Sequence, residues 1–220
     1  MNSPTLYLDV LILLASVHPS GFSFAVRSVL ERNGDETINR LALMYLSIPF
    51  FLLLPMIGVL KKDLYFISVS SPVFYLLALL FIPGCIFLEY GLNRIYLYVT
   101  TGKKYKGLTL HADWKSHYTV LSLLLISFVA IGEEFIFRQC WFFILAKTFS
   151  LPVGVIILIT SLIYALNHLH YGIHTVLSKF VSGSIYGSLY VWGGYNILLP
   201  MVTHVFQNLA LIGIGRNKNG

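Results

Sequence analysis

The sequence predicts an all-α protein, a polytopic membrane helix bundle of about seven transmembrane helices. Of its 220 residues, 57% are hydrophobic and only 11% are charged, whereas a soluble domain has roughly 45–50% apolar and about 25% charged residues. The apolar residues also gather in runs of about 20, the length of helix that spans a bilayer. Both observations favour one compact membrane bundle and leave no room for a sizeable soluble domain.

Seven apolar runs are the expected helices. They cover residues 5–26, 41–60, 64–88, 118–146, 152–170, 174–193 and 195–214. The first run is the weakest because it contains Asp9 and a break at His18–Gly21. The N-terminus lacks a basic n-region and a cleavage site, so we expect this run to be a retained helix. The fourth run is the longest and carries charged residues, so we expect it to tilt or to break.

The loops between the runs differ in charge. With the N-terminus outside, ten of the fifteen lysines and arginines fall in inner segments and three in outer loops, which predicts an N-out, C-in topology. The basic segment near 91–117 is expected either to lie along the inner interface, against anionic headgroups, or to form a solvated loop. A net charge of +6, spread between apolar runs, does not indicate a nucleic-acid partner; the lipid bilayer is the expected surrounding.

The stretch "IGEEFIFRQC", residues 131–140, places three charges inside the fourth run. An ionisable residue at mid-bilayer depth costs at least ~2.5–3.5 kcal/mol and marks function by default. Glu134 and Arg138 are four residues apart, one helical turn, and are expected to form an ion pair. Glu133 has apolar Phe137 four residues on, and we expect it to act as a general base. The structural alternative is a buried salt bridge that only fixes helix packing.

Two further runs carry histidines. The fifth ends in "SLIYALNHLH", with Tyr164 and His168 four apart, and the seventh contains "PMVTHVFQNLA", with His204 and Asn208 four apart. We expect Glu133 and His168 to hold and deprotonate a water, and His204 and Asn208 to donate to the oxyanion of an attacked carbonyl. No cofactor is firmly predicted. Zinc held by Glu and His is the alternative, although the sequence has no HExxH motif.

These motifs resemble those of a known family. "EEFIFR" is similar to EExxxR, "YALNH" to FxxxH with Tyr164 in place of Phe, and "HVFQN" to HxxxN, in the order found in the CPBP intramembrane proteases, the type II CAAX prenyl endopeptidases and their bacterial relatives. The resemblance covers about residues 118–212. The change from Phe to Tyr is expected to affect packing only.

The resemblance implies a role for each matching position. Glu133 activates water, Glu134 and Arg138 organise that activation, and His168 shares the water. His204 and Asn208 stabilise the oxyanion. The implied activity is that of an intramembrane endopeptidase, by a glutamate or a metal-dependent mechanism, on a membrane-associated peptide or protein tail.

The apolar runs and the reach of the resemblance together give the expected organisation. Residues 1–117 form N-terminal transmembrane helices, residues 118–214 a catalytic helix core, and residues 215–220 a short polar tail. The protein is expected in a bacterial inner membrane or the endoplasmic reticulum.

Two other functions compete with that of an endopeptidase. One is a small proton-coupled transporter, which inverted repeats would favour, although we see none. The other is a catalytically silent protein of the bacteriocin-immunity type, against which the intact motifs argue.

Overall fold

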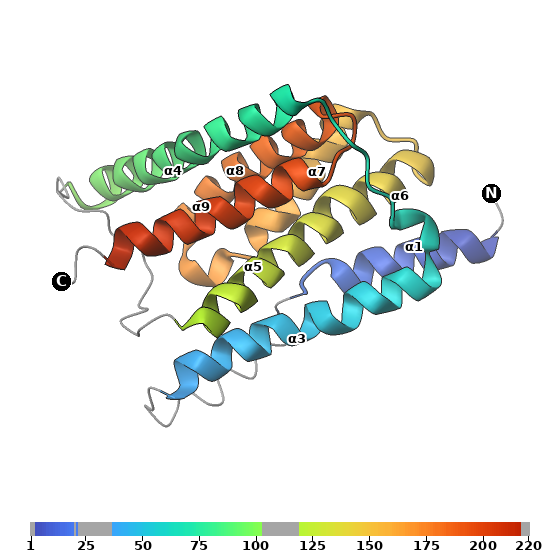
Figure 1. The fold of residues 1–220 in the computed structure, drawn as a ribbon, viewed down its shortest axis with the longest axis horizontal. Coiled ribbons are helices and arrows are strands. Elements are labelled where there is room, and N and C mark those ends of the chain that lie inside the picture. Colours follow the sequence, from blue (N-terminus) through green and yellow to red (C-terminus); the bar gives the residue numbers. More distant parts are fainter. Residues whose placement is uncertain (1–2, 20, 22–36, 103–118, 217–220) are drawn as a thin grey trace. The chain divides into compact units, whose positions relative to one another are not determined.

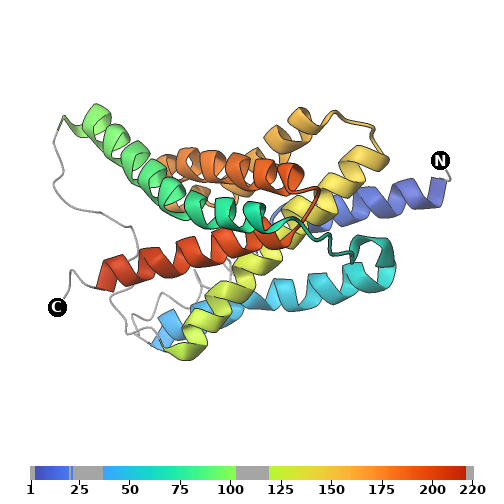
Figure 2. The same cartoon turned by 45° about the horizontal axis from the view of Figure 1, so that its top comes forward.

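The computed structural model describes residues 3–19, 21, 37–102 and 119–216. Within these ranges all regular structure is helical, as Figures 1 and 2 show, so the all-α class is confirmed for the described part of the chain. The chain divides into two compact units, each built from two separate stretches of sequence. The expected division at residue 117 stays a prediction.

The first unit comprises Met1–Phe66 and Asp113–Pro152. Its elements are α1 (Ser3–Ser16), α3 (Thr37–Leu60), the 3-10 turn η2 (Lys62–Leu64), α5 (Val120–Glu134), the π-helix η3 (Phe135–Cys140) and α6 (Trp141–Lys147). Helix α3 packs along α5, where Phe51 stacks on Phe128 with ring centroids 4.1 Å apart. The Phe50 side chain packs directly on Gly132, since a Cβ there would lie 2.5 Å from Cδ1 of Phe50.

The elements α5, η3 and α6 form one apolar helix, Val120–Lys147. It begins at Thr119, whose side chain accepts a hydrogen bond from the backbone N–H of Ser122, as an N-cap residue does. The helix does not break, and its tilt stays a prediction; it continues through a π-helical segment, in which i→i+5 hydrogen bonds replace the α-helical ones.

The second unit comprises Ile67–Ala112 and Val153–Gly220. Its elements are α4 (Pro72–Thr101), α7 (Val153–Leu166), the 3-10 turn η4 (Leu169–Tyr171), α8 (Ile173–Trp192) and α9 (Leu198–Arg216). Helix α8 packs against α7, α4 and α9, and α4 also lies along α9. Asn196, between α8 and α9, donates to Ser70 Oγ and Tyr75 OH, each at 2.9 Å, and so ties this turn to the start of α4.

Membrane-spanning length is clear for two helices of the described chain, α4 and Val120–Lys147. The surface of α4 fits a lipid environment, with Leu80 69% and Phe87 73% exposed, more apolar exposure than a water-facing helix carries. The other apolar helical stretches among the described residues are 10–17 residues long: Pro4–Ser16, Ser47–Leu60, Val153–Leu166 and Leu198–Ile214. A helix lies within each of the seven predicted runs, but seven membrane crossings and their orientation stay predictions.

The third predicted run, 64–88, was misplaced. The helix begins at Pro72 and continues to Thr101, because Pro fits the first turn of a helix and Gly102 closes it with φ 66° and a hydrogen bond to Tyr98 O. Residues 91–101 of the expected interfacial segment are therefore helical, and 103–117 lie outside the described residues. So do residues 22–26 of the first run and 217–220 of the predicted tail.

Candidate active site

The charged motif lies where α5 gives way to the π-helix. Glu133 and Glu134 are the last residues of α5, and Arg138 lies within η3. All three are buried, and Glu134 and Arg138 have 0% exposure. Arg138 Nε donates to Glu134 Oε2 at 3.1 Å, so the predicted ion pair is confirmed. Glu133 has interactions of its own, and its candidacy as a base therefore rests on its position beside the ion pair.

The π-helix is itself anchored by a residue that sequence reasoning overlooked. Gln139 is fully buried, and its Nε2 donates to the backbone oxygens of Leu64 at 2.9 Å and Phe66 at 2.7 Å. These carbonyls belong to the irregular chain near η2, where no helix supplies donors. The extra residue of a π turn shifts the side chains that follow it, and such turns are frequent at functional sites. The one sequence signal was a glutamine inside an apolar run.

A second buried charge in the first unit is structural. Asp9 of α1 accepts a hydrogen bond from Thr148 Oγ1 at 2.5 Å and forms an ion pair with Lys61. Trp141 Nε1 donates to Ser16 Oγ at 3.0 Å and ties α6 to the end of α1. The acidic residue that weakened the first predicted helix is thus neutralised by contacts distant in sequence.

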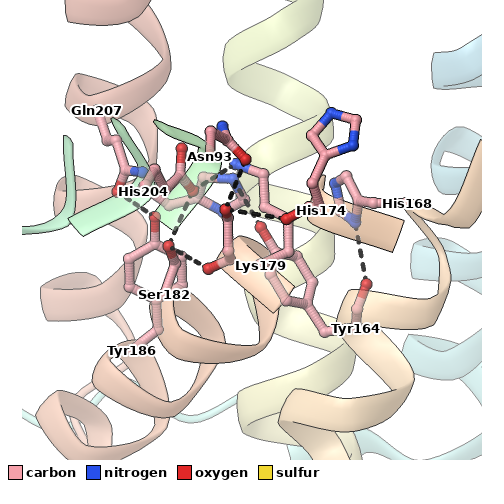
Figure 3. Close-up of polar contacts among 11 residues, drawn as sticks. Asn93, Tyr164, His168, His174, Lys179, Ser182, Tyr186, His204 and Gln207 are labelled. Carbon is pink, nitrogen blue, oxygen red and sulfur yellow. Dashed lines mark hydrogen bonds and ion pairs between the residues drawn. The ribbon is translucent and has the colours of Figure 1, made fainter. Parts of the chain in front are cut away.

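Both candidate histidines surround Tyr164 of α7, as Figure 3 shows. The Tyr164 hydroxyl lies 3.4 Å from His204 Nε2, and the Tyr164 ring contacts the His168 ring at a centroid distance of 5.0 Å. The expectation that Tyr in place of Phe affects packing only is therefore wrong, because the added hydroxyl reaches a candidate catalytic ring. Sequence spacing alone could not pair residues 164 and 204.

The protonation of His168 follows from its position. Helix α7 ends at Leu166, so His168 lies in the turn before η4 and not inside a helix that continues to residue 170. Its Nδ1 is 3.0 Å from Tyr164 O. A carbonyl only accepts, so Nδ1 carries the proton and Nε2 is the unprotonated acceptor of the neutral ring. This tautomer suits a residue that accepts a hydrogen bond from water.

His204 is buried on α9, and its ring stacks on Tyr186 of α8 with centroids 5.0 Å apart and a 25° angle between planes. Asn208 lies one turn further along the same helix and is half-buried. Gln207 lies between them in sequence, is fully buried, and accepts a hydrogen bond from Tyr186 OH at 2.5 Å. The aromatic ring and the glutamine were not predicted as part of this site.

A partly buried ion pair joins α4 to α8 near this cluster. Lys179 Nζ and Ser182 Oγ both donate to Glu89 Oε1 at 2.8 Å. Lys179 and His174 appear in the same close-up as His168 and His204 (Figure 3). The charge of Lys179 is therefore compensated by Glu89. The predicted third run ended at residue 88, just before this glutamate, whereas α4 continues past it to Thr101.

The predicted residues thus form two groups. The first unit brings Glu133, Glu134 and Arg138 together, and the second unit gathers His168 and His204 around Tyr164, with Asn208 on the His204 helix. A meeting of the two groups stays a prediction. Within either unit, the described residues include no cluster of three His, Cys, Asp or Glu side chains able to hold a metal ion, and zinc stays an untested alternative.

Comparison with known proteins gives one finding for this region. Residues 115–210 match the family model described as "Type II CAAX prenyl endopeptidase Rce1-like". The matched range includes all six predicted site residues and extends from the start of the long charged helix into α9. Neither a curated protein nor a solved structure matches the chain.

Proposed function

From the premise that this chain belongs, through residues 115–210, to the Rce1-like type II CAAX prenyl endopeptidases of the CPBP family, we propose that it is an intramembrane endopeptidase that cleaves the tail of a membrane-associated peptide or protein. The observation that carries the proposal is the fully buried Glu134–Arg138 pair directly beside Glu133. Burying a carboxylate and an arginine carries a desolvation penalty of several kcal/mol for each ion. Their retention next to a third charged residue favours catalysis over packing.

In the proposed reaction, Glu133 takes a proton from water while His168 Nε2 accepts a hydrogen bond from the same water. The water oxygen bonds to the scissile carbonyl carbon. His204 and Asn208 donate to the oxyanion that develops on the carbonyl oxygen. Glu133 then returns the proton to the leaving nitrogen as the C–N bond breaks, so that protons balance over the cycle.

The other polar side chains have supporting roles in this proposal. Arg138 compensates the charge of Glu134, so that Glu133 is not forced to titrate against a second uncompensated carboxylate. The hydrogen bond from His168 Nδ1 to Tyr164 O keeps the water-accepting nitrogen unprotonated, as second-shell partners of histidines commonly do. If zinc is bound, Glu133 and the two histidines are its candidate ligands and the metal would polarise the attacking water.

The substrate is proposed to be membrane-associated for two reasons. The matching family is named for CAAX prenyl endopeptidases, and a prenylated CAAX terminus carries a lipid chain; in addition, α4 exposes large apolar side chains. A site reached through lipid favours a substrate segment that lipid already holds. The host membrane, either a bacterial inner membrane or the endoplasmic reticulum, is part of the proposal.

The test is to express the wild type and Glu133→Gln in membranes and to compare the C-termini of small membrane-associated proteins by mass spectrometry. Glu133→Gln keeps the shape and removes the base, so truncated C-termini should disappear. Asp63→Asn is the control, since it neutralises an exposed carboxylate outside the three motifs. Truncation that persists in Glu133→Gln, or that is lost equally in both variants at equal amounts of folded protein, would contradict the proposal.

A further inference from the structure

The chain contains two buried glutamines in opposite hydrogen-bonding states. Gln139 Nε2 donates to two backbone carbonyls. Gln207 is equally buried, yet its Nε2 finds no acceptor among the described residues, and only its Oε1 is used, by Tyr186 OH at 2.5 Å. An unsatisfied buried donor costs about 1–3 kcal/mol. Gln139 therefore has a structural explanation, and the amide nitrogen of Gln207 has none within the described chain.

The orientation of the Gln207 amide is fixed by a chain of contacts. The Tyr186 ring stacks on His204, and its hydroxyl holds Oε1 of Gln207. A side-chain amide has its oxygen and nitrogen on opposite sides, so binding of the oxygen by Tyr186 turns the N–H₂ group away from Tyr186. Figure 3 shows Tyr186, His204 and Gln207 together, drawn from α8 and α9.

The position of Gln207 on α9 suits a contact with substrate. Gln207 follows His204 by three residues, about 4.5 Å along the helix axis, and Asn208 follows His204 by four. The three side chains therefore share one helical face. An extended peptide places its carbonyl groups about 3.3 Å apart along the chain, on alternating sides. A donor one turn from the proposed oxyanion contact is therefore nearer to the carbonyl two residues from the scissile one, which points to the same side of the peptide, than to the scissile carbonyl itself.

We propose that the Gln207 side-chain amide is a substrate-binding group, donating from Nε2 to the main-chain carbonyl of an extended peptide two residues from the scissile one, and that Tyr186 orients it. This inference rests on the proposed function. Main-chain hydrogen bonds of this kind bind a peptide without reading its side chains. Because the amide is fully buried, a peptide reaches it only when neighbouring side chains move aside.

The decisive variant is the double substitution Tyr186→Phe/Gln207→Leu. It keeps the ring that stacks on His204 and replaces both hydrogen-bond partners by apolar groups of similar shape, a change that is close to neutral or stabilising for a group that lacks a partner. Gln139→Leu is the matched control for stability, because it strands two backbone carbonyls. Thermal unfolding of the purified full chain in lipid nanodiscs compares the two variants.

Binding is measured with a fluorescent farnesylated CAAX-type peptide in the inactive Glu133→Gln background, by anisotropy. We expect Tyr186→Phe/Gln207→Leu to weaken the peptide Kd about 3–10-fold, the loss of one hydrogen bond, with an unchanged or higher Tm. Gln139→Leu should lower the Tm. With the Glu133 carboxylate restored, the double variant should show a raised KM and an almost unchanged kcat, the signature of lost ground-state binding.

Three outcomes would overturn the inference. A fall in Tm as large as that of Gln139→Leu with an unchanged Kd would make Gln207 a packing residue. A lower kcat with an unchanged KM would make the Tyr186 and Gln207 pair a support for His204. An unchanged Kd together with an unchanged Tm would leave the amide without a role in binding. Failure of the wild type to cleave the peptide would overturn the proposed function and this inference together, whereas cleavage with any of the three outcomes overturns this inference alone.

Discussion

Removal of the Arg138 guanidinium should be far more damaging to the fold than removal of the Glu133 charge. Arg138 and Glu134 are both fully buried, and their side chains meet at 3.1 Å. Arg138→Ala leaves Glu134 as an uncompensated buried charge, which costs about 3–5 kcal/mol. Glu133→Gln instead keeps the volume and the hydrogen-bonding capacity of the side chain. We expect it to cost less than ~1 kcal/mol and to abolish cleavage.

A double substitution isolates the ion pair from the cavity that a smaller side chain leaves. Arg138→Met with Glu134→Leu replaces both partners by apolar groups of similar size, a change that is often neutral or stabilising by about 1–4 kcal/mol. The free energy of unfolding should therefore fall strongly for Arg138→Met alone and recover in the double variant. Denaturant unfolding of the purified protein, followed by tryptophan fluorescence, gives the three values.

The reasoning has clear refutations. If Arg138→Met is as stable as the wild type, Glu134 does not depend on the guanidinium. If the double variant is no more stable than Arg138→Met, the loss comes from packing and not from a stranded carboxylate. Equal loss of folded protein in Arg138→Ala and Glu133→Gln would contradict the assignment of Glu133 as the base and Glu134 as the partner of the structural ion pair.

Three further predictions concern packing, the tyrosine and topology. Gly132→Ala should destabilise the chain by about 1–3 kcal/mol through a clash with Phe50, and Phe50→Leu should relieve part of that loss in a thermal unfolding assay. Tyr164→Phe restores the residue usual in the family motif and removes one hydroxyl, so stability should fall by about 0.5–1.5 kcal/mol while steady-state cleavage survives. Single cysteines placed beside His168 and Asn208, in a chain cleared of its native cysteines, should react faster with an impermeant thiol reagent in inverted vesicles than in intact cells. Faster labelling from outside at both positions would contradict either the predicted topology or access to the site from the inner side.

Local features of the fold were predictable because neighbours in sequence are neighbours on a helix. The apolar runs predicted helices because their length matched a bilayer and their composition left little else to form. The Glu134–Arg138 pair was predictable because a four-residue spacing places both side chains on one face. Helix boundaries were harder to predict. The start of α4 at Pro72 and its end at Thr101 depend on capping residues whose neighbours are as apolar as the helix itself.

The contacts around the candidate site were decided by tertiary structure. Lys179 finds Glu89 ninety residues away, and Tyr164 meets His204 across forty. Gln139 and Gln207 look alike in sequence, yet the first donates to two carbonyls, whereas the second, among the described residues, only accepts.

The sequence by itself determined the helical class, the membrane character of α4 and of the long charged helix, and the identity of the residues that carry the three motifs. It could not determine which partner each buried polar group obtains. That choice depends on which helix faces are packed together, and a polar side chain takes whichever complementary group the packing brings within hydrogen-bond distance.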